Sequence, residues 1–177
     1  ARTGRVNYAE TPHLFHNRGK GQFVDIGREV GADFAAPKVG RGAAFGDVDL
    51  DGDLDVLVTT NGGPAALYRN DVSRAGQRFR LTLRGVKSNR DAIGAHVRVK
   101  VGTSVQTRIV RTASSYLSQS ELPLTFGLGS APAADEVIVE WPNGTKQRLT
   151  GRRAARSYVV TEGTGITEDV ALGSAAR

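Results

Sequence analysis

The strictest pattern in this chain is an alternation of apolar and polar side chains over residues 93–101. Its apolar positions are Ile93, Ala95, Val97, Val99 and Val101, and its polar positions include His96, Arg98 and Lys100. Successive side chains of a β-strand point to opposite faces, so a period of two predicts a strand with one buried face. Residues 78–84 alternate in the same way and predict a second such strand.

Short apolar runs separated by turn signals continue along the whole chain. The runs that we interpret as strands are residues 23–26, 54–59, 105–111, 122–128, 137–141 and 158–160. The chain has 22 glycines in 177 residues, above the usual share of about 7%. Asn143-Gly144 suits a hairpin turn, because both residues tolerate positive φ. These features predict an all-β fold, with a β-sandwich-like arrangement in the second half.

Composition removes several classes of function. The absence of cysteine excludes disulfides, thiol catalysis and cysteine-ligated zinc. No apolar run approaches the roughly 20 residues that span a membrane, so we expect no membrane span. The chain begins at Ala1, and we interpret it as a processed product or a fragment.

Charge divides the chain into two parts. Residues 1–76 hold nine Lys/Arg and ten Asp/Glu, whereas residues 77–177 hold fifteen and eight. Such asymmetry indicates two units with different surfaces. We therefore predict one unit over residues 1–76 and a second over 77–161. The small, polar residues 162–177 predict a flexible tail.

Five aspartates lie within nine residues at positions 47–55. They are Asp47, Asp49, Asp51, Asp53 and Asp55. Crowded carboxylates either titrate at raised pKa values or bind a cation. Ca²⁺ takes six to eight oxygen ligands, and Gly52 suits the sharp turn that such a loop needs. The pattern predicts a structural Ca²⁺ site, to which Asp53 would give its backbone carbonyl.

Other interpretations of the loop stay open. The EF-hand pattern fails, because Val58 occupies the position of the closing glutamate and strands flank the loop on both sides. Mg²⁺ suits the loop less well, since it favours few carboxylates and retained waters. A solvated acidic turn that binds no ion is the remaining alternative.

The aspartate loop also carries a family resemblance. Residues 42–55 resemble the calcium-loop signature of FG-GAP/VCBS repeats, which form blades of β-propellers. Residues 14–17 and 67–70 are similar to each other at a period of 53, as a repeat would require. The resemblance implies that the five aspartates are calcium ligands. It also implies partial propeller blades, with the remaining blades of the parent chain as partners.

The second unit resembles the ASPIC/UnbV domain. The matching stretches are residues 87–95, 114–120, 126–129 and 139–144. The two resemblances together imply the C-terminal part of a cartilage-acidic-protein-like propeller protein. Such proteins are exported or extracellular, which implies an extracellular protein or glycan as partner.

No catalytic motif stands in the sequence. The nucleophile elbow G-x-S-x-G, the S-x-x-K motif, H-E-x-x-H and the phosphate-binding loop are all missing, so we expect no enzyme. Our main hypothesis is a calcium-binding, non-catalytic binding or adhesion module. The alternative is binding of a polyanion, an acidic glycan or a nucleic acid, through the basic second unit. The residues that would carry it are Arg78, Arg80, Arg84, Arg98, Lys100, Arg108, Arg111, Arg152, Arg153 and Arg156. Nucleic acid is the weaker of the two polyanions, because no aromatic residues interleave as a base-stacking platform.

Overall fold

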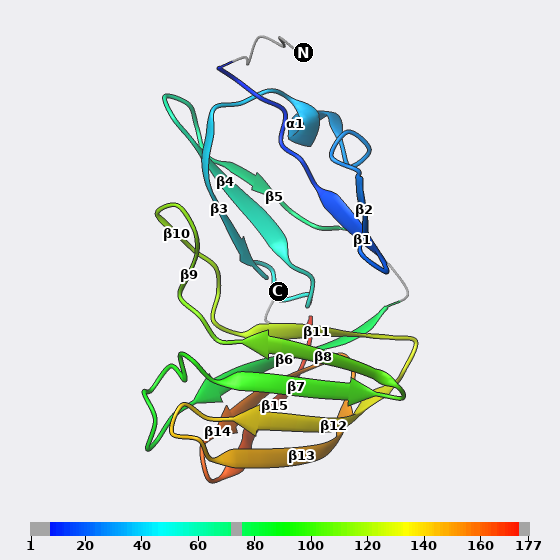
Figure 1. Ribbon diagram of the computed structural model, residues 1–177, viewed down its shortest axis with the longest axis vertical. Helices are drawn as coiled ribbons and strands as arrows, with labels where there is room; N and C mark the ends of the chain where they lie inside the picture. Colours follow the sequence, from blue (N-terminus) through cyan, green and yellow to red (C-terminus); the bar gives the residue numbers. More distant parts are fainter. Residues whose placement is uncertain (1–7, 72–75, 174–177) are drawn as a thin grey trace.

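The computed structural model describes residues 8–71 and 76–173. The chain is nearly all β and forms two units that follow each other along its long axis (Figure 1). Within the described residues the helix α1 is a single turn, Ala32–Ala35, and none of the sheets closes on itself. The predicted all-β class is therefore confirmed. No helix in these residues has the length and apolar character that a membrane crossing needs.

The first unit contains a hairpin and a three-stranded antiparallel sheet in the order β3-β4-β5. Its strands are β1 (Phe15–Gly19), β2 (Gln22–Asp25), β3 (Gly40–Gly46), β4 (Asp55–Thr60) and β5 (Ala66–Tyr68). The aspartate loop joins β3 to β4. Gly46 pairs with Asp55 across the two strands, so the loop begins and ends at one point of the sheet.

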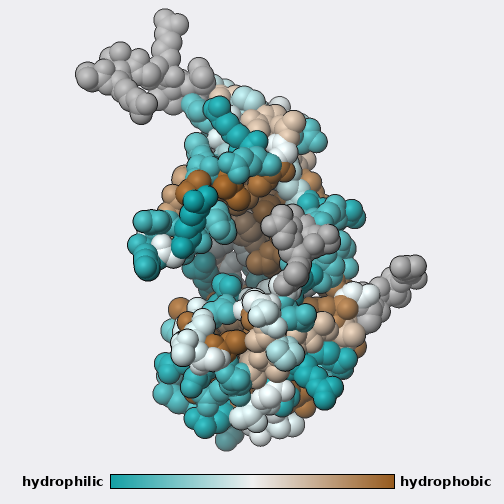
Figure 2. Space-filling view, turned by 90° about the vertical axis from the view of Figure 1, so that its right-hand side faces the viewer, coloured by the Kyte–Doolittle hydropathy of each residue, from teal (hydrophilic) through white to brown (hydrophobic). Residues whose placement is uncertain are grey.

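The two faces of this small sheet differ in what covers them. On one face, Tyr68 packs edge-on against Phe34 of α1, with 5.1 Å between the ring centroids. On the other, the cross-strand partners Leu57 and Leu67 are 40% and 56% exposed. Apolar side chains accordingly reach the surface of this unit (Figure 2), and the first unit leaves an apolar sheet face uncovered.

The second unit packs two four-stranded sheets face to face. The sheet orders are β11-β6-β14-β15 and β13-β12-β7-β8. The strands are β6 (Gln77–Arg84), β7 (His96–Val101), β8 (Ser104–Ile109), β11 (Leu124–Gly129), β12 (Ala133–Glu140), β13 (Lys146–Arg153), β14 (Arg156–Thr161) and β15 (Gly165–Ala171). Each pair of neighbours is antiparallel except β6 and β14, which run parallel.

The core of the molecule lies between these two sheets. Phe79 and Phe126 stack with ring centroids 5.6 Å apart, and both are fully buried with Val97 and Val99. The sequence alternation is confirmed from residue 96 onwards, since Val97 and Val99 of β7 point inward and the polar positions of the strand are exposed. Ile93, which the alternation placed on the buried face, lies before the strand and is 38% exposed. Burial of the apolar surfaces of the core is the main source of stability in the second unit.

The predicted flexible tail over residues 162–177 is wrong up to residue 171. Glu162 is only 7% exposed, and β15 pairs with β14 as the edge strand of a sheet. Small, polar residues suit this edge strand because five of its seven residues are exposed; Ile166 supplies the apolar contact with the core. Residues 174–177 of the predicted tail lie outside the described residues.

Glu162 fixes a loop of the second unit. Its Oε2 accepts hydrogen bonds from the backbone N–H groups of Val86, Lys87 and Ser88 at 2.7, 2.7 and 2.8 Å, and Asn143 donates to its Oε1. Burial opposes ionisation of Glu162, but the hydrogen bonds outweigh it and lower the pKa of the carboxyl to about 2. A charged carboxylate thus joins the end of β14 to the loop that follows β6.

A polar hairpin reaches from the second unit to the first. It consists of β9 (Ala113–Ser115) and β10 (Ser118–Gln119). The backbone N–H of Phe45 donates to Ser120 Oγ at 3.1 Å, and its carbonyl accepts from the N–H of Glu121 at 2.9 Å. Free strand edges invite pairing with other chains. The serine-rich segment therefore covers the outer edge of β3.

Candidate metal centre

The aspartate loop turns tightly between β3 and β4. Leu50 and Gly52 both have left-handed backbone conformations, with φ of 60° and 94°. Glycine adopts this conformation without strain, and a side chain at position 52 would meet Leu172 and Arg78 at under 3 Å. The turn folds the loop so that its first and last aspartates, Asp47 and Asp55, become buried.

Three of the five predicted ligands come together. Asp47, Asp49 and Asp55 each offer a carboxylate oxygen, and these three atoms all lie within 4.8 Å of one another. The carboxylate of Asp55 is held in place by the N–H groups of Val48 and Asn70, at 2.9 and 2.8 Å. Oxygen atoms at such spacing form the kind of site that Ca²⁺ occupies.

The other two aspartates lie outside this group. Asp51 Oδ1 accepts a hydrogen bond from the N–H of Asp53 at 2.8 Å. The carboxylate of Asp53 pairs with Arg78, whose Nη2 lies 3.1 Å from its Oδ2. Burial raises the pKa of Asp53, and the charge of Arg78 acts in the opposite direction. A ligand role for Asp51, and for the carbonyl of Asp53, stays a prediction.

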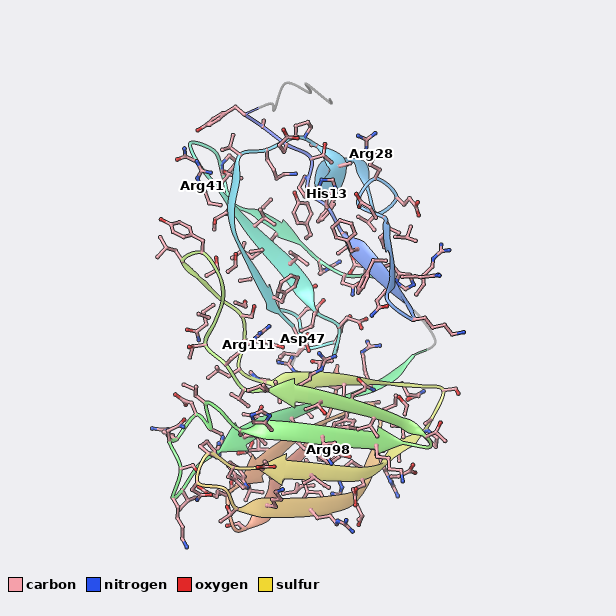
Figure 3. The ribbon with its side chains drawn as sticks, in the orientation of Figure 1. His13, Arg28, Arg41, Asp47, Arg98 and Arg111 are labelled. Atoms are coloured by element: carbon pink, nitrogen blue, oxygen red, sulfur yellow. The ribbon has the colours of Figure 1, made fainter. Side chains whose placement is uncertain are left out.

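Arg80 of β6 binds the loop from the second unit, through Asp47. Figure 3 labels Asp47 at the junction of the two units. The guanidinium of Arg80 is buried and forms ion pairs with Asp47 Oδ2 and with Glu121 Oε2. Glu121 also accepts a hydrogen bond from the N–H of Asp47 at 3.2 Å. Burial raises the pKa of Glu121, against the opposing charge of Arg80. The loop and the second unit therefore share one buried cluster of charges.

The burial and hydrogen bonding of two carboxylate oxygens in this cluster indicate whether a cation would fit there. Asp47 Oδ1 and Glu121 Oε1 are buried and have no hydrogen-bond partner. One guanidinium faces two carboxylates, so it leaves one negative charge unbalanced. A buried carboxylate oxygen without a partner is unfavourable, and a hard cation beside Asp47 would remove that penalty. The residues present thus fit Ca²⁺, and Asp47, Asp49 and Asp55 are the residues that would hold it.

The structure corrects the predicted basic face of β6. Arg80 is 5% exposed and the side chain of Arg78 is 24% exposed, so these two cannot belong to an open basic surface. Arg84 is exposed, but it pairs with Glu168 at 3.0 Å. Alternation correctly placed the arginines opposite the core, but it could not show that the aspartate loop lies over that face.

Sequence reasoning also missed the roles of Arg80 and Glu121. They lie 33 and 74 positions from Asp47, in a segment that sequence assigns to a different unit. The one signal available is an excess of charge, since five aspartates in one loop require compensation. That excess does not show which of the 24 basic residues supplies the compensating positive charge.

Comparison with protein families agrees with this architecture. The FG-GAP-like repeat model matches residues 5–58, which include the aspartate loop, and the ASPIC and UnbV model matches residues 85–167, which form most of the sandwich. The chain belongs to the proteins that join an FG-GAP-like repeat to an ASPIC and UnbV domain.

The chain is similar to curated proteins named Cartilage acidic protein 1. It is 37% identical to the Xenopus tropicalis protein over 155 residues, which are 88% of this chain and 24% of that protein. It is 40% identical to the Homo sapiens protein over 67 residues, or 38% of this chain and 10% of that protein. The chain thus spans a quarter or less of the length of these relatives.

Proposed function

We propose that this chain is a calcium-binding, non-catalytic module through which an exported protein binds a partner outside the cell. The observation that carries the calcium part is the buried, unpartnered Oδ1 of Asp47 within the group of three carboxylates. The ion would hold the first and last aspartates of the loop together and so fix the junction of β3 and β4. It would act as a structural ion, since no motif for a nucleophile or a base accompanies the loop.

Calcium should stabilise the folded chain. An ion that binds only the folded state adds about 2.7 kcal/mol to the free energy of unfolding at a hundredfold excess over its Kd. A thermal melt with excess Ca²⁺ and then with a chelator measures this increment. We expect several degrees of stabilisation by Ca²⁺ and a much smaller effect of Mg²⁺.

The matched variants are Asp49→Asn and Asp91→Asn. Both aspartates are exposed and both changes remove one negative charge, but only Asp49 belongs to the carboxylate group. Asp49→Asn should lose most of the calcium increment, and Asp91→Asn should keep it. Equal stabilisation of the parent and of Asp49→Asn by calcium would show that Asp49 is not a ligand, and no stabilisation of the parent would show that the loop is only an acidic turn.

Further propeller blades of a parent chain are proposed partners of the first unit. Phe15 and Phe23 of the hairpin are 61% and 59% exposed, and Leu57 and Leu67 add a second apolar surface. Exposed apolar surfaces of this kind mark contacts with other protein surfaces. Adjacent blades of the same type would bury them. The export of the parent protein and its extracellular location are part of this proposal and rest on the family resemblance.

Polyanion binding is the second candidate function. The ion pairs of the structure reduce the number of basic residues that could carry it. Arg78, Arg80, Arg84 and Arg156 are engaged by carboxylates. Arg98 and Lys100 remain on the exposed face of β7, and Arg108 and Arg111 lie near the junction of the units. These two pairs of cations lie on different surfaces, so variants can separate their contributions.

A further inference from the structure

We propose that the groove between the two units binds a saccharide that carries a carboxylate, and that Arg108 and Arg111 recognise its charge. This deepens the proposed function by naming the class of partner and its site, and it rests on the binding role but not on calcium. The groove has a volume of about 770 Å³. That volume lies in the usual range for ligand sites, which often form where two units meet.

The groove is lined by both apolar and polar side chains. Phe45 and Leu54 of the first unit line it, and they are 41% and 39% exposed. Ile109 at the end of β8 lies on the other wall and is 45% exposed. The polar lining comes largely from hydroxyl groups, those of Thr107, Ser114, Ser115, Ser120 and Thr125. An aromatic ring beside several hydroxyls suits a sugar, which has an apolar C–H face and a rim of hydroxyl groups.

Positive charge in the groove selects an anionic sugar. Arg108 and Arg111 line it, and neither forms an ion pair with any of the residues that the structure describes. Arg108 is held over the ring of Phe126 at 5.4 Å, which fixes its guanidinium. Figure 3 shows Arg111 beside the aspartate loop, at the junction of the two units. The acidic group in the lining is Glu121, whose Oε2 is already paired with Arg80.

Unsatisfied polar atoms in the wall point to a ligand as well. Thr125 Oγ1 and Glu121 Oε1 both belong to residues of the lining, are buried and lack a hydrogen-bond partner. Buried polar atoms are rarely left without a partner in folded proteins. Because both oxygens are buried, a hydroxyl group of a bound sugar would donate to either of them only after the side chain turns toward the groove. A carboxylate would instead be drawn to the two guanidinium groups, where paired charges give the strongest hydrogen bonds.

A binding experiment with three probes tests the proposal on the full chain. The probes are a hyaluronan hexasaccharide, the same hexasaccharide with its carboxylates methyl-esterified, and a hexaglutamate peptide. Calorimetry should show binding of the acidic saccharide and at least tenfold weaker binding of the ester and the peptide. Equal binding of the ester would refute recognition of charge. Equal binding of the peptide would replace the saccharide with an acidic peptide as the partner.

Two double variants, each of which removes two positive charges, locate the binding site. Arg108→Gln with Arg111→Gln alters the groove, and Arg98→Gln with Lys100→Gln alters the exposed face of β7. All four residues are exposed, so thermal melts should show that both proteins fold. The first variant should weaken saccharide binding at least tenfold and the second less than threefold. Equal losses in both, or no binding by the parent, would overturn the proposal. Because the calcium melt is a separate readout, failure here leaves the metal site unaffected.

Discussion

Replacing Arg80 with methionine should strongly destabilise the chain, because it removes one cation from two buried carboxylates. The side chain of Arg80 is 6% exposed, that of Asp47 is fully buried and that of Glu121 is 19% exposed. Methionine keeps much of the volume of arginine but brings no charge. Asp47 would be left with its backbone hydrogen bond from Gly52, and in calcium-free buffer both carboxylates would face each other without a counter-charge.

The expected loss follows from the burial of this cluster. Removing one partner of a buried ion pair typically costs about 3–5 kcal/mol. Arg84→Met on the same face of the same strand is the matched control. Its pair with Glu168 has side chains that are 56% and 50% exposed, and an exposed pair contributes only about 0–1 kcal/mol. The two substitutions therefore make the same chemical change at sites that differ in burial and in the number of paired carboxylates, two for Arg80 and one for Arg84.

Urea unfolding followed by tryptophan fluorescence measures both variants. The chain has one tryptophan, Trp141, which is 2% exposed in the core of the second unit. Glu121→Gln in the Arg80→Met background should restore part of the loss, since it removes one of the stranded charges. A loss in Arg80→Met within about 1 kcal/mol of that in Arg84→Met would refute a buried, stability-determining ion pair.

Two further predictions concern the loop that follows β6. Glu162 has a folded-state pKa of about 2 against an ordinary value of 4.5, so its contribution to stability is complete above pH 4.5 and is lost as the pH falls from there towards 2. Glu162→Gln should flatten this part of the pH dependence of stability in acid unfolding; an unchanged slope would show that another group causes it. Gly85→Ala should destabilise by more than about 2 kcal/mol, because its Cβ would lie 2.0 Å from the carbonyl oxygen of Asn89. Gly127→Ala on β11 is the control, since its Cβ would meet nothing within 4 Å; equal melting temperatures for the two variants would contradict this assignment.

Sequence periodicity was sufficient for β6 and β7 because both strands are amphipathic. In β7 every second side chain is apolar and buried, and that pattern needs no knowledge of the neighbouring strand. β15 has no such pattern. Four of its seven residues are Gly, Thr, Glu and Asp, and its place is set by hydrogen bonds to β14 and not by burial. An edge strand of this type cannot be distinguished from a polar tail by composition.

Only the aspartate loop of the candidate site was predictable from the sequence. The spacing of the aspartates identifies the loop, and Gly52 accounts for its turn. Which aspartates can bind an ion depends on residues outside the loop. Asp53 forms an ion pair with Arg78, and Asp47 forms one with Arg80. Both arginines come from β6, and no local pattern connects that strand with the loop.

The order of the strands in the second unit has a consequence for how the chain folds. β6 is the first strand of the sandwich, yet it lies between β11 and β14. Its partners are contributed 47 and 77 residues later along the chain, as the pairs Phe79–Phe126 and Phe79–Arg156 show by their numbering. Contacts between distant segments carry a loop-closure cost and slow folding. On a ribosome, β6 would have to wait until β14 has emerged before its sheet could be completed. During that interval Arg80 would already be available to the aspartate loop, which precedes it by only a few dozen residues.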